Sequence, residues 1–246
     1  MVEHLEVTGM VLSAMPIGDY DKRLVILTKE RGKISVFAKG ARRQNSPFMA
    51  GSRPFSFGKF TLYEGRNSYG LTNVAITNYF TELSSDFENA YYGFYFLELA
   101  DYFGREGIEA AETLNLLYAS FLALKKHNIK NILIRYIYEL KTLVINGEYP
   151  SLFSCLYCGS KENLLWFDES KNGIYCTNCK EYSKYPVKLE NSTLYALQFI
   201  ISKPIKELFT FTVSDAVLKQ IKEFAEYYMR QYVQKEFKSL EILENM

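Results

Sequence analysis

The chain has 246 residues, of which 48% are hydrophobic and 23% charged, a composition that excludes a disordered chain and is typical of a folded globule. Its net charge is only +1, so total charge alone does not predict a nucleic-acid partner. No apolar run reaches the roughly 18 residues that a membrane-spanning helix needs, and the first residues lack the basic start and apolar stretch of a signal peptide. We therefore expect a cytoplasmic protein without a membrane partner, whose thiols stay reduced.

The first 80 residues are predicted to form β-strands. Short runs rich in β-branched and aromatic residues alternate with turn residues, including a hairpin signal at Gly65-Arg66-Asn67. The expected strands cover residues 5–12, 23–28, 33–39, 57–63 and 69–76. Because no helical segment separates these five strands, they favour a small antiparallel barrel, and the oligonucleotide/oligosaccharide-binding fold (OB-fold) is the candidate of this size.

Positive charge is concentrated in the predicted barrel. Residues 22–66 contain eleven Lys and Arg against two Glu, a net charge of +9, which leaves −8 for the rest of a chain whose total is +1. Six of the cations lie on the loop after the third strand or on the strands before it, and these are the predicted DNA-binding residues: Lys39, Arg42, Arg43, Lys22, Arg23 and Lys33. Such a cluster attracts phosphate, although many lysines only solvate a surface. Aromatic residues interleave with the cations, and we expect most of them in the barrel core.

From about residue 84 the hydrophobic spacing becomes helical. Ser84-Ser85-Asp86 is a predicted N-cap, and aromatic residues follow it at helical intervals. Further helices are expected over about 109–125, 130–146, 191–202 and 214–240. The predicted class is therefore α+β and multidomain, with a barrel domain over residues 1–80 and a helical domain over residues 81–246.

All four cysteines lie in an interruption of the helical domain, at about residues 150–186. They form two Cys-x-x-Cys pairs, Cys155 with Cys158 and Cys176 with Cys179, separated by 17 residues. Two such turns bring four thiolates to one tetrahedral ion and leave no open coordination position, so we expect one structural zinc. Four free thiols and a disulfide pair are the alternatives, and a reducing compartment argues against the disulfide.

Signals for catalysis are weak. The two histidines, His4 and His127, lie in different segments, and the sequence contains neither a Walker-type phosphate loop nor a nucleophile motif. We find no pair of carboxylates with an acid–base role. We therefore do not expect an enzyme.

Six features distributed along the chain form a specific combination. They are the segment Gly18-Asp19-Tyr20-Asp21-Lys22-Arg23, which continues to Thr28, then Gly32-Lys33-Ile34, Ala38-Lys39-Gly40-Ala41-Arg42-Arg43, Glu139-Leu140-Lys141, Gly147-Glu148-Tyr149-Pro150, and the four cysteines. In this order they resemble the RecO family of bacterial recombination mediators, and the similarity covers nearly the whole chain.

The resemblance implies an N-terminal OB-fold, a helical domain and an inserted zinc module. It also implies a role in DNA repair and homologous recombination: binding of single- and double-stranded DNA without sequence specificity, and annealing of complementary strands. RecO-like proteins pair with RecR and help to load RecA onto strands coated by single-stranded-DNA-binding protein. The implied location is the cytoplasm, at the nucleoid.

A further implied partner is the acidic, apolar-ended C-terminal tail of single-stranded-DNA-binding protein. In the family its site lies on the helical domain, and Arg135 is the predicted contact for the tail carboxylate, with a solvated helix arginine as the alternative. Two other functions stay open. A zinc-stapled protein–protein adaptor predicts no annealing and salt-insensitive binding, and an enzyme would need polar groups that converge beside a cavity.

Overall fold

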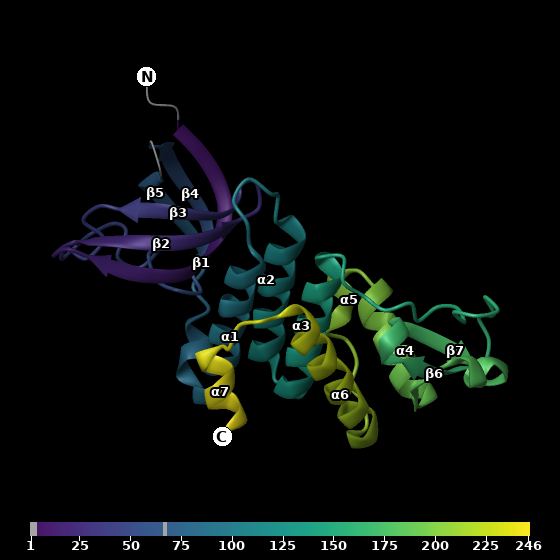
Figure 1. Ribbon diagram of the computed structural model, residues 1–246. Coiled ribbons are helices and arrows are strands. Elements are labelled where there is room, and N and C mark those ends of the chain that lie inside the picture. Colours follow the sequence, from purple (N-terminus) through teal and green to yellow (C-terminus); the bar gives the residue numbers. More distant parts are fainter. Residues whose placement is uncertain (1–3, 66–67) are drawn as a thin grey trace. The chain divides into compact units, whose positions relative to one another are not determined.

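The computed structural model describes residues 4–65 and 68–246, and the chain divides into two compact units (Figure 1). The first unit comprises Met1–Lys126 and Glu236–Met246, and the second comprises His127–Lys235. None of the described helices is both long and apolar enough to cross a membrane.

The first unit begins with a closed barrel of five strands. The strands are β1 (His4–Ile17), β2 (Asp21–Thr28), β3 (Gly32–Ala38), β4 (Phe57–Glu64) and β5 (Tyr69–Asn78). Their order is β1-β2-β3-β5-β4, and β4 pairs back with β1; the β3–β5 pair is parallel and the others are antiparallel. The barrel confirms the predicted OB-fold class.

Strand alternation explains the barrel core. Along β3, Ile34, Val36 and Ala38 are buried, while the residues between them are only half-buried, as expected for side chains that alternate between two faces. Strand β1 is longer than the predicted 5–12, because a register shift between Val11 and Ser13 bends it so that its first half pairs with β4 and its second half with β2. The expected Gly65-Arg66-Asn67 hairpin turn includes residues 66 and 67, which lie outside the described residues.

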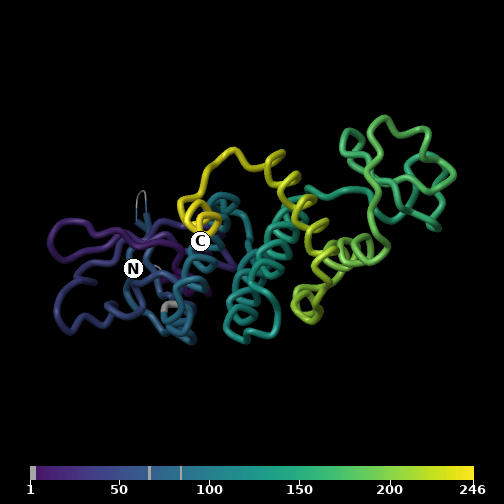
Figure 2. The backbone as a smooth tube through the Cα atoms, turned by 90° about the horizontal axis from the view of Figure 1, so that it is seen from below, coloured from purple at the N-terminus to yellow at the C-terminus, as the bar shows by residue number. Residues whose placement is uncertain are grey.

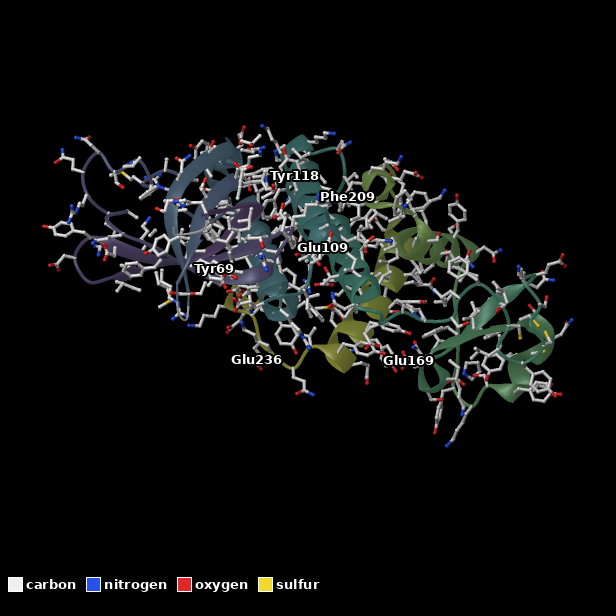
Figure 3. The ribbon with its side chains drawn as sticks, turned by 90° about the horizontal axis from the view of Figure 1, so that it is seen from above. Tyr69, Glu109, Tyr118, Glu169, Phe209 and Glu236 are labelled. Atoms are coloured by element: carbon white, nitrogen blue, oxygen red, sulfur yellow. The ribbon has the colours of Figure 1, made fainter. Side chains whose placement is uncertain are left out.

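Four helical segments complete the first unit: η1 (Thr81–Ser85), α1 (Phe87–Phe103), α2 (Ala111–Lys126) and α7 (Lys238–Glu244). Asp86 caps α1 by accepting a hydrogen bond from the Asn89 N–H at 2.8 Å. Aromatic rings join the barrel to α2: Tyr118, labelled in Figure 3, lies 4.6 Å from Phe57 and 5.2 Å from Phe80 between ring centroids. Phe80 is buried, whereas Phe57 and Tyr118 are half-buried. Of the aromatic residues that interleave with the cations, Phe55, Phe60 and Tyr69 are buried but Tyr63 is exposed, so the predicted aromatic core is confirmed only in part.

The second unit combines helices with a small sheet. Its elements are α3 (Asn131–Ile145), β6 (Leu164–Asp168), η2 (Glu169–Lys171), β7 (Gly173–Cys176), η3 (Thr177–Tyr182), β8 (Pro186–Lys188), α4 (Asn191–Ser202), α5 (Ile205–Leu208) and α6 (Asp215–Tyr232). The sheet order is β7-β6-β8, and it lies in the predicted interruption between α3 and α4. Figure 2 shows the path of the backbone through this segment, in green.

The prediction of a single helix over residues 214–240 is wrong. Helix α6 ends at Tyr232, Val233 is extended, and α7 begins only at Lys238. No proline or glycine marks the break. Instead, the ring of Phe237 packs 5.5 Å from Tyr95 and 6.1 Å from Tyr102 of α1, between ring centroids, so tertiary packing interrupts the helix.

The packing divides the chain at a different place from the change in secondary structure. The last barrel strand ends at Asn78, near the predicted boundary at residue 80, but α1 and α2 belong to the same compact unit as the barrel. The division into a barrel domain over residues 1–80 and a helical domain over residues 81–246 stays a prediction.

Candidate metal centre and candidate nucleic-acid interface

The four cysteines converge on one point in the small sheet module. Cys155 and Cys158 lie on the turn before β6, Cys176 ends β7, and Cys179 lies in η3. All four Sγ atoms lie within 4.8 Å of one another, and the Sγ atoms of Cys158 and Cys176 are 3.7 Å apart. A tetrahedral site with metal–sulfur bonds of about 2.3 Å has edges of about 3.8 Å. The cysteines are free thiols, so the disulfide alternative is wrong and the set fits one tetrahedral ion.

The first Cys-x-x-Cys turn directs backbone donors at a sulfur. The Cys155 carbonyl accepts a hydrogen bond from the Gly159 N–H at 2.9 Å, and Gly159 has φ of 73°, which suits a residue without Cβ. Burial raises the pKa of Cys155, but N–H groups of Cys158, Cys176 and Tyr157 favour its thiolate and bring the pKa down to about 6. One thiolate is therefore available near neutral pH.

The pKa of the Cys179 thiol shifts in the opposite direction from that of Cys155. Burial, followed by hydrogen bonds that the Cys179 thiol donates to the other three cysteines and by the negative charge of Cys155, raises the pKa of Cys179 to about 12. Four crowded sulfurs therefore resist full ionisation on their own. A divalent ion that prefers sulfur, held by the four cysteines, would offset this repulsion and favour the thiolate form of the remaining thiols.

A buried carboxylate holds the module around the cysteines. Asp168, at the end of β6, accepts hydrogen bonds of 2.6–3.1 Å from the N–H and Oγ of Ser170, the Oγ of Ser183 and the N–H of Lys184. Burial raises the pKa of Asp168, but these donors outweigh burial and hold the pKa below its ordinary value. No sequence pattern marks Asp168, because a single Asp in a polar module is usually a surface charge.

Cations gather at the end of the barrel where β1 turns into β2. Five side chains meet here and are called the turn cluster: Tyr20, Lys22, Arg42, Arg43 and Arg53. The Arg42 N–H donates to the Tyr20 carbonyl at 2.8 Å, and its Nη1 donates to the Gly18 carbonyl at 3.0 Å. The guanidinium carbon of Arg43 lies 5.3 Å from the centroid of the Tyr20 ring. Three of the six predicted DNA-binding residues are thus brought together.

The electrostatics of the turn cluster favour an anion. The Nζ of Lys22 donates to the carbonyl and Oγ of Ser52 at 2.8 and 3.1 Å. Burial lowers the pKa of Lys22, and the nearby charges of Arg53 and Arg42 lower it further. Since these cations repel one another, a phosphate placed among them relieves the repulsion.

The loop that carries the two arginines is anchored to the barrel. The Gly40 N–H donates to the Asp21 carboxylate at 2.7 Å, and Ala41 is fully buried. Arg42 and Arg43 follow on the exposed side of this anchor, and Lys39 is exposed immediately before it. The loop therefore presents three cations from a fixed backbone.

The other two predicted cations lie elsewhere on the barrel. Arg23 is directed to the outer face, where its Nε donates to the Ser35 Oγ at 2.9 Å. Lys33 lies at the start of β3, roughly 17 Å along the strand from Ala38. Its Nζ donates to the Asp101 carbonyl at 2.6 Å and lies 3.3 Å from the Asp101 carboxylate. DNA contact by Arg23 and Lys33 stays a prediction, outside the turn cluster.

Arg135 is buried in α3. Its Nε lies 2.7 Å from the Glu139 Oε1, and the side chain is only 6% exposed. It is therefore not a solvated helix arginine. Contact between Arg135 and a partner tail stays a prediction.

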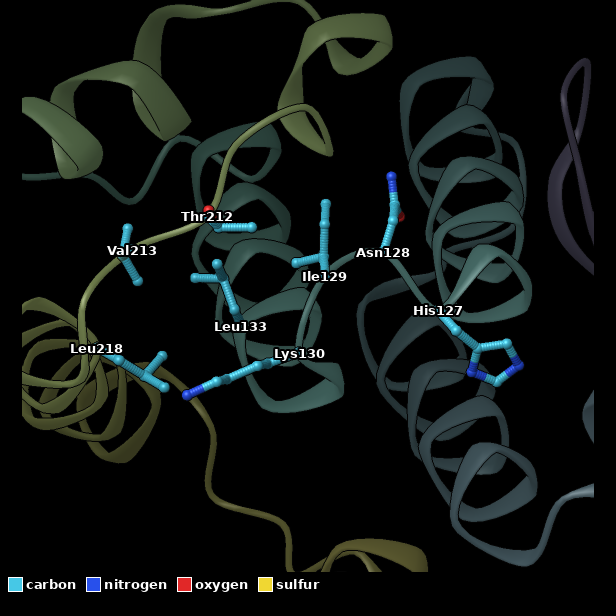
Figure 4. Close-up of a pocket in the computed structure, with 8 residues that line it drawn as sticks. All are labelled: His127, Asn128, Ile129, Lys130, Leu133, Thr212, Val213 and Leu218. Carbon is cyan, nitrogen blue, oxygen red and sulfur yellow. The ribbon is translucent and has the colours of Figure 1, made fainter.

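The second unit contains an open cavity of about 290 Å³ at the start of α3 (Figure 4). Its lining residues are His127, Asn128, Ile129, Lys130, Leu133, Thr212, Val213 and Leu218. The Lys130 Nζ lies 2.6 Å from the Asp215 carboxylate, in an exposed ion pair. The cavity thus combines apolar walls with an accessible cation.

Comparisons with known proteins agree over the whole length. Residues 1–80 match the family model described as Recombination protein O N terminal, and residues 84–241 match Recombination protein O C terminal. DNA repair protein RecO of Acetivibrio thermocellus is 27% identical over 246 residues, covering 100% of this chain and 98% of its own. DNA repair protein RecO of Alkaliphilus metalliredigens is 30% identical over 240 residues, covering 97% and 98%. The barrel, the helical segments and both matched models together show that this chain belongs to the RecO family of DNA repair proteins.

Proposed function

We propose that the chain is a recombination mediator that binds single- and double-stranded DNA without sequence specificity and anneals complementary strands. The turn cluster is the observation that carries the proposal. Together with Lys39 it places five cations at one end of an OB-fold barrel. The turn between β1 and β2 and the start of β2 add two carboxylates, those of Asp19 and Asp21. One of these two, Asp21, is already bound to the Gly40 N–H.

The mechanism involves no covalent chemistry by the chain. Lysines and arginines of the turn cluster neutralise phosphates and release counterions. Two strands held on one basic surface repel each other less, so their bases test for pairing at a lower electrostatic cost. Phosphate contacts carry no base information, which makes the activity independent of sequence.

The direct test is annealing of complementary fluorescent oligonucleotides, with and without a coating of single-stranded-DNA-binding protein. We expect the chain to accelerate annealing in both cases, and we expect the acceleration to fall as salt rises, because the contacts are ionic. No acceleration, together with salt-insensitive partner binding, would instead support the protein–protein adaptor.

The metal in the cysteine site is proposed to be one structural zinc. Four thiolates in a tetrahedral arrangement suit zinc and leave no position for a reacting ligand. When bound, the ion supplies folding free energy to the module. Cys155, Cys158, Cys176 and Cys179 hold it.

The partners follow from the family. The chain is proposed to act in the cytoplasm at the nucleoid, to pair with RecR, and to help load RecA onto coated strands. The tail of single-stranded-DNA-binding protein is proposed to bind the second unit, with its apolar end in the cavity of Figure 4. Arg135 stays the predicted carboxylate contact, and Lys130 at the cavity is a second cation for the same role, because an exposed ion pair is exchanged at little cost.

Titration of a labelled acidic peptide with an apolar C-terminus tests the tail site. Lys130→Ala and Arg135→Ala are each expected to weaken peptide binding several-fold, since a charge-assisted contact to a carboxylate is lost. Thermal melts are the control for Arg135→Ala, which also breaks a buried ion pair. Wild-type affinity in Arg135→Ala removes Arg135 from the site, and wild-type affinity in both variants places the tail elsewhere.

A further inference from the structure

The turn between β1 and β2 presents an aromatic ring to solvent. The Tyr20 side chain is 54% exposed, whereas Phe55 and Phe60 of the barrel region are buried. Its backbone carbonyl accepts the hydrogen bond from Arg42, so the ring is attached to the same fixed backbone as the cations. Because the ring is exposed in this position, it contributes little to the core. Core packing therefore does not explain the presence of a tyrosine here.

One face of the ring is already occupied. The guanidinium of Arg43 lies over it, with 5.3 Å from its carbon to the ring centroid. This separation is too short for another planar group to enter between them, because two van der Waals gaps of about 3.5 Å need about 7 Å. With Arg43 over one face and 54% of the side chain still exposed, Tyr20 has surface left for a further planar partner.

The surroundings determine what kind of planar partner fits. Lys22, Arg42 and Arg53 lie in the same turn cluster, so a ligand with phosphates beside its ring satisfies both the cations and the tyrosine. Met15 and Ile17, at the end of β1, are exposed next to the turn and extend its apolar surface. Base–aromatic stacking between cationic backbone contacts is a general mode of binding single strands.

Whether the bases are paired determines which form of DNA the Tyr20 ring can stack on. Inside a duplex the faces of the bases are covered by their neighbours, so a ring on a surface turn reaches a base face only if the base leaves the stack. An unpaired strand presents base faces without that cost. Stacking on a face also leaves the Watson–Crick edge of the base uncovered.

We propose that Tyr20 is a base-stacking residue: an unpaired nucleobase lies on the ring face opposite Arg43 while the neighbouring cations bind the flanking phosphates. This inference rests on the proposed DNA-binding function and adds to it a preference for single strands. It also gives annealing a physical step, because a stacked base is held with its pairing edge open to a second strand.

The test compares three ligands of equal length: a single-stranded oligonucleotide, the same backbone with abasic sites, and a duplex. We expect Tyr20→Ala to weaken binding of the base-containing single strand by about fivefold to a hundredfold. Binding of the abasic strand and of the duplex should change less than about twofold, because phosphate contacts remain. Tyr20→Phe keeps the ring and should keep wild-type affinity, and Tyr195→Ala, which removes an exposed tyrosine from α4, is the matched control.

The possible results distinguish failure of base stacking by Tyr20 from failure of the proposed DNA-binding function. Equal losses for all three ligands in Tyr20→Ala would show that Tyr20 only supports the arginine loop, and unchanged binding of the single strand would also overturn stacking while leaving DNA binding intact. A wild-type chain that binds none of the three ligands would overturn the proposed function and the inference with it. Quenching of a 2-aminopurine base by wild type and Tyr20→Phe, but not by Tyr20→Ala, is the expected spectroscopic signature.

Discussion

Replacing Cys176 by serine is expected to reduce bound zinc from about one ion per chain to nearly none and to unfold the sheet module. Cys176 is buried at the end of β7, and its N–H also favours the Cys155 thiolate. Small structural zinc sites contribute on the order of 10 kcal/mol to folding, so a site with three thiolates loses most of the stabilisation. Metal analysis of the purified protein measures the first effect.

Fluorescence measures the second effect, because Trp166 on β6 is the only tryptophan of the chain. The Nζ of Lys180 lies 3.8 Å from its ring centroid, so unfolding of the module changes the surroundings of the indole and moves its emission to longer wavelength. Thr177→Ser is the matched control, since it keeps the hydroxyl that donates to the Asn163 carbonyl at 3.3 Å. A Cys176→Ser protein that is free of metal but has wild-type emission and melting would contradict a structural zinc.

The double substitution Arg42→Ala with Arg43→Ala is expected to weaken DNA binding roughly tenfold or more at moderate salt, whatever the sequence. Both side chains are exposed on the anchored loop of the turn cluster, where phosphates are the expected ligands. Loss of two phosphate contacts should lower the slope of log affinity against log salt by about 1.4 for single strands and about 1.8 for duplex. Salt titrations with two unrelated oligonucleotides measure affinity, slope and sequence independence together.

The matched control removes two exposed cations from the other end of the same barrel. Lys29 and Arg31 lie at the turn between β2 and β3, which is at the opposite end of β2 from the turn cluster. Lys29→Ala with Arg31→Ala removes the same charge, so it should lower affinity and slope much less. Equal effects of the two double variants would show that net charge alone attracts DNA, and an unchanged affinity in Arg42→Ala with Arg43→Ala would remove these arginines from the interface.

Local patterns in the sequence determined most of the elements and the candidate metal ligands. Strand β3 follows from the alternation of Ile34, Val36 and Ala38, because a strand buried on one face repeats every second residue. The cysteine site follows from the Cys-x-x-Cys spacing, since each pair lies on one short turn and needs no knowledge of the rest of the fold. The excess of cations in residues 22–66 is likewise visible without a structure.

Contacts between residues far apart in the sequence determined the features that local patterns did not predict. The six predicted DNA-binding cations have similar sequence contexts, but strand direction sends Lys33 to the far end of the barrel and pairs it with Asp101, while Arg42 joins Lys22. Arg135 looks like any helix arginine until its burial beside Glu139 is seen. The break before α7 depends on where the ring of Phe237 packs.

Tyr20 shows most clearly what the sequence by itself left undecided. It stands in a motif that predicts the family, but an aromatic residue near a strand is usually part of the core. Only the tertiary structure leaves its ring exposed and places the Arg43 guanidinium over one face. The physical reason is that local sequence determines which backbone conformation a residue favours, whereas exposure and charge contacts depend on segments that meet after the barrel has closed.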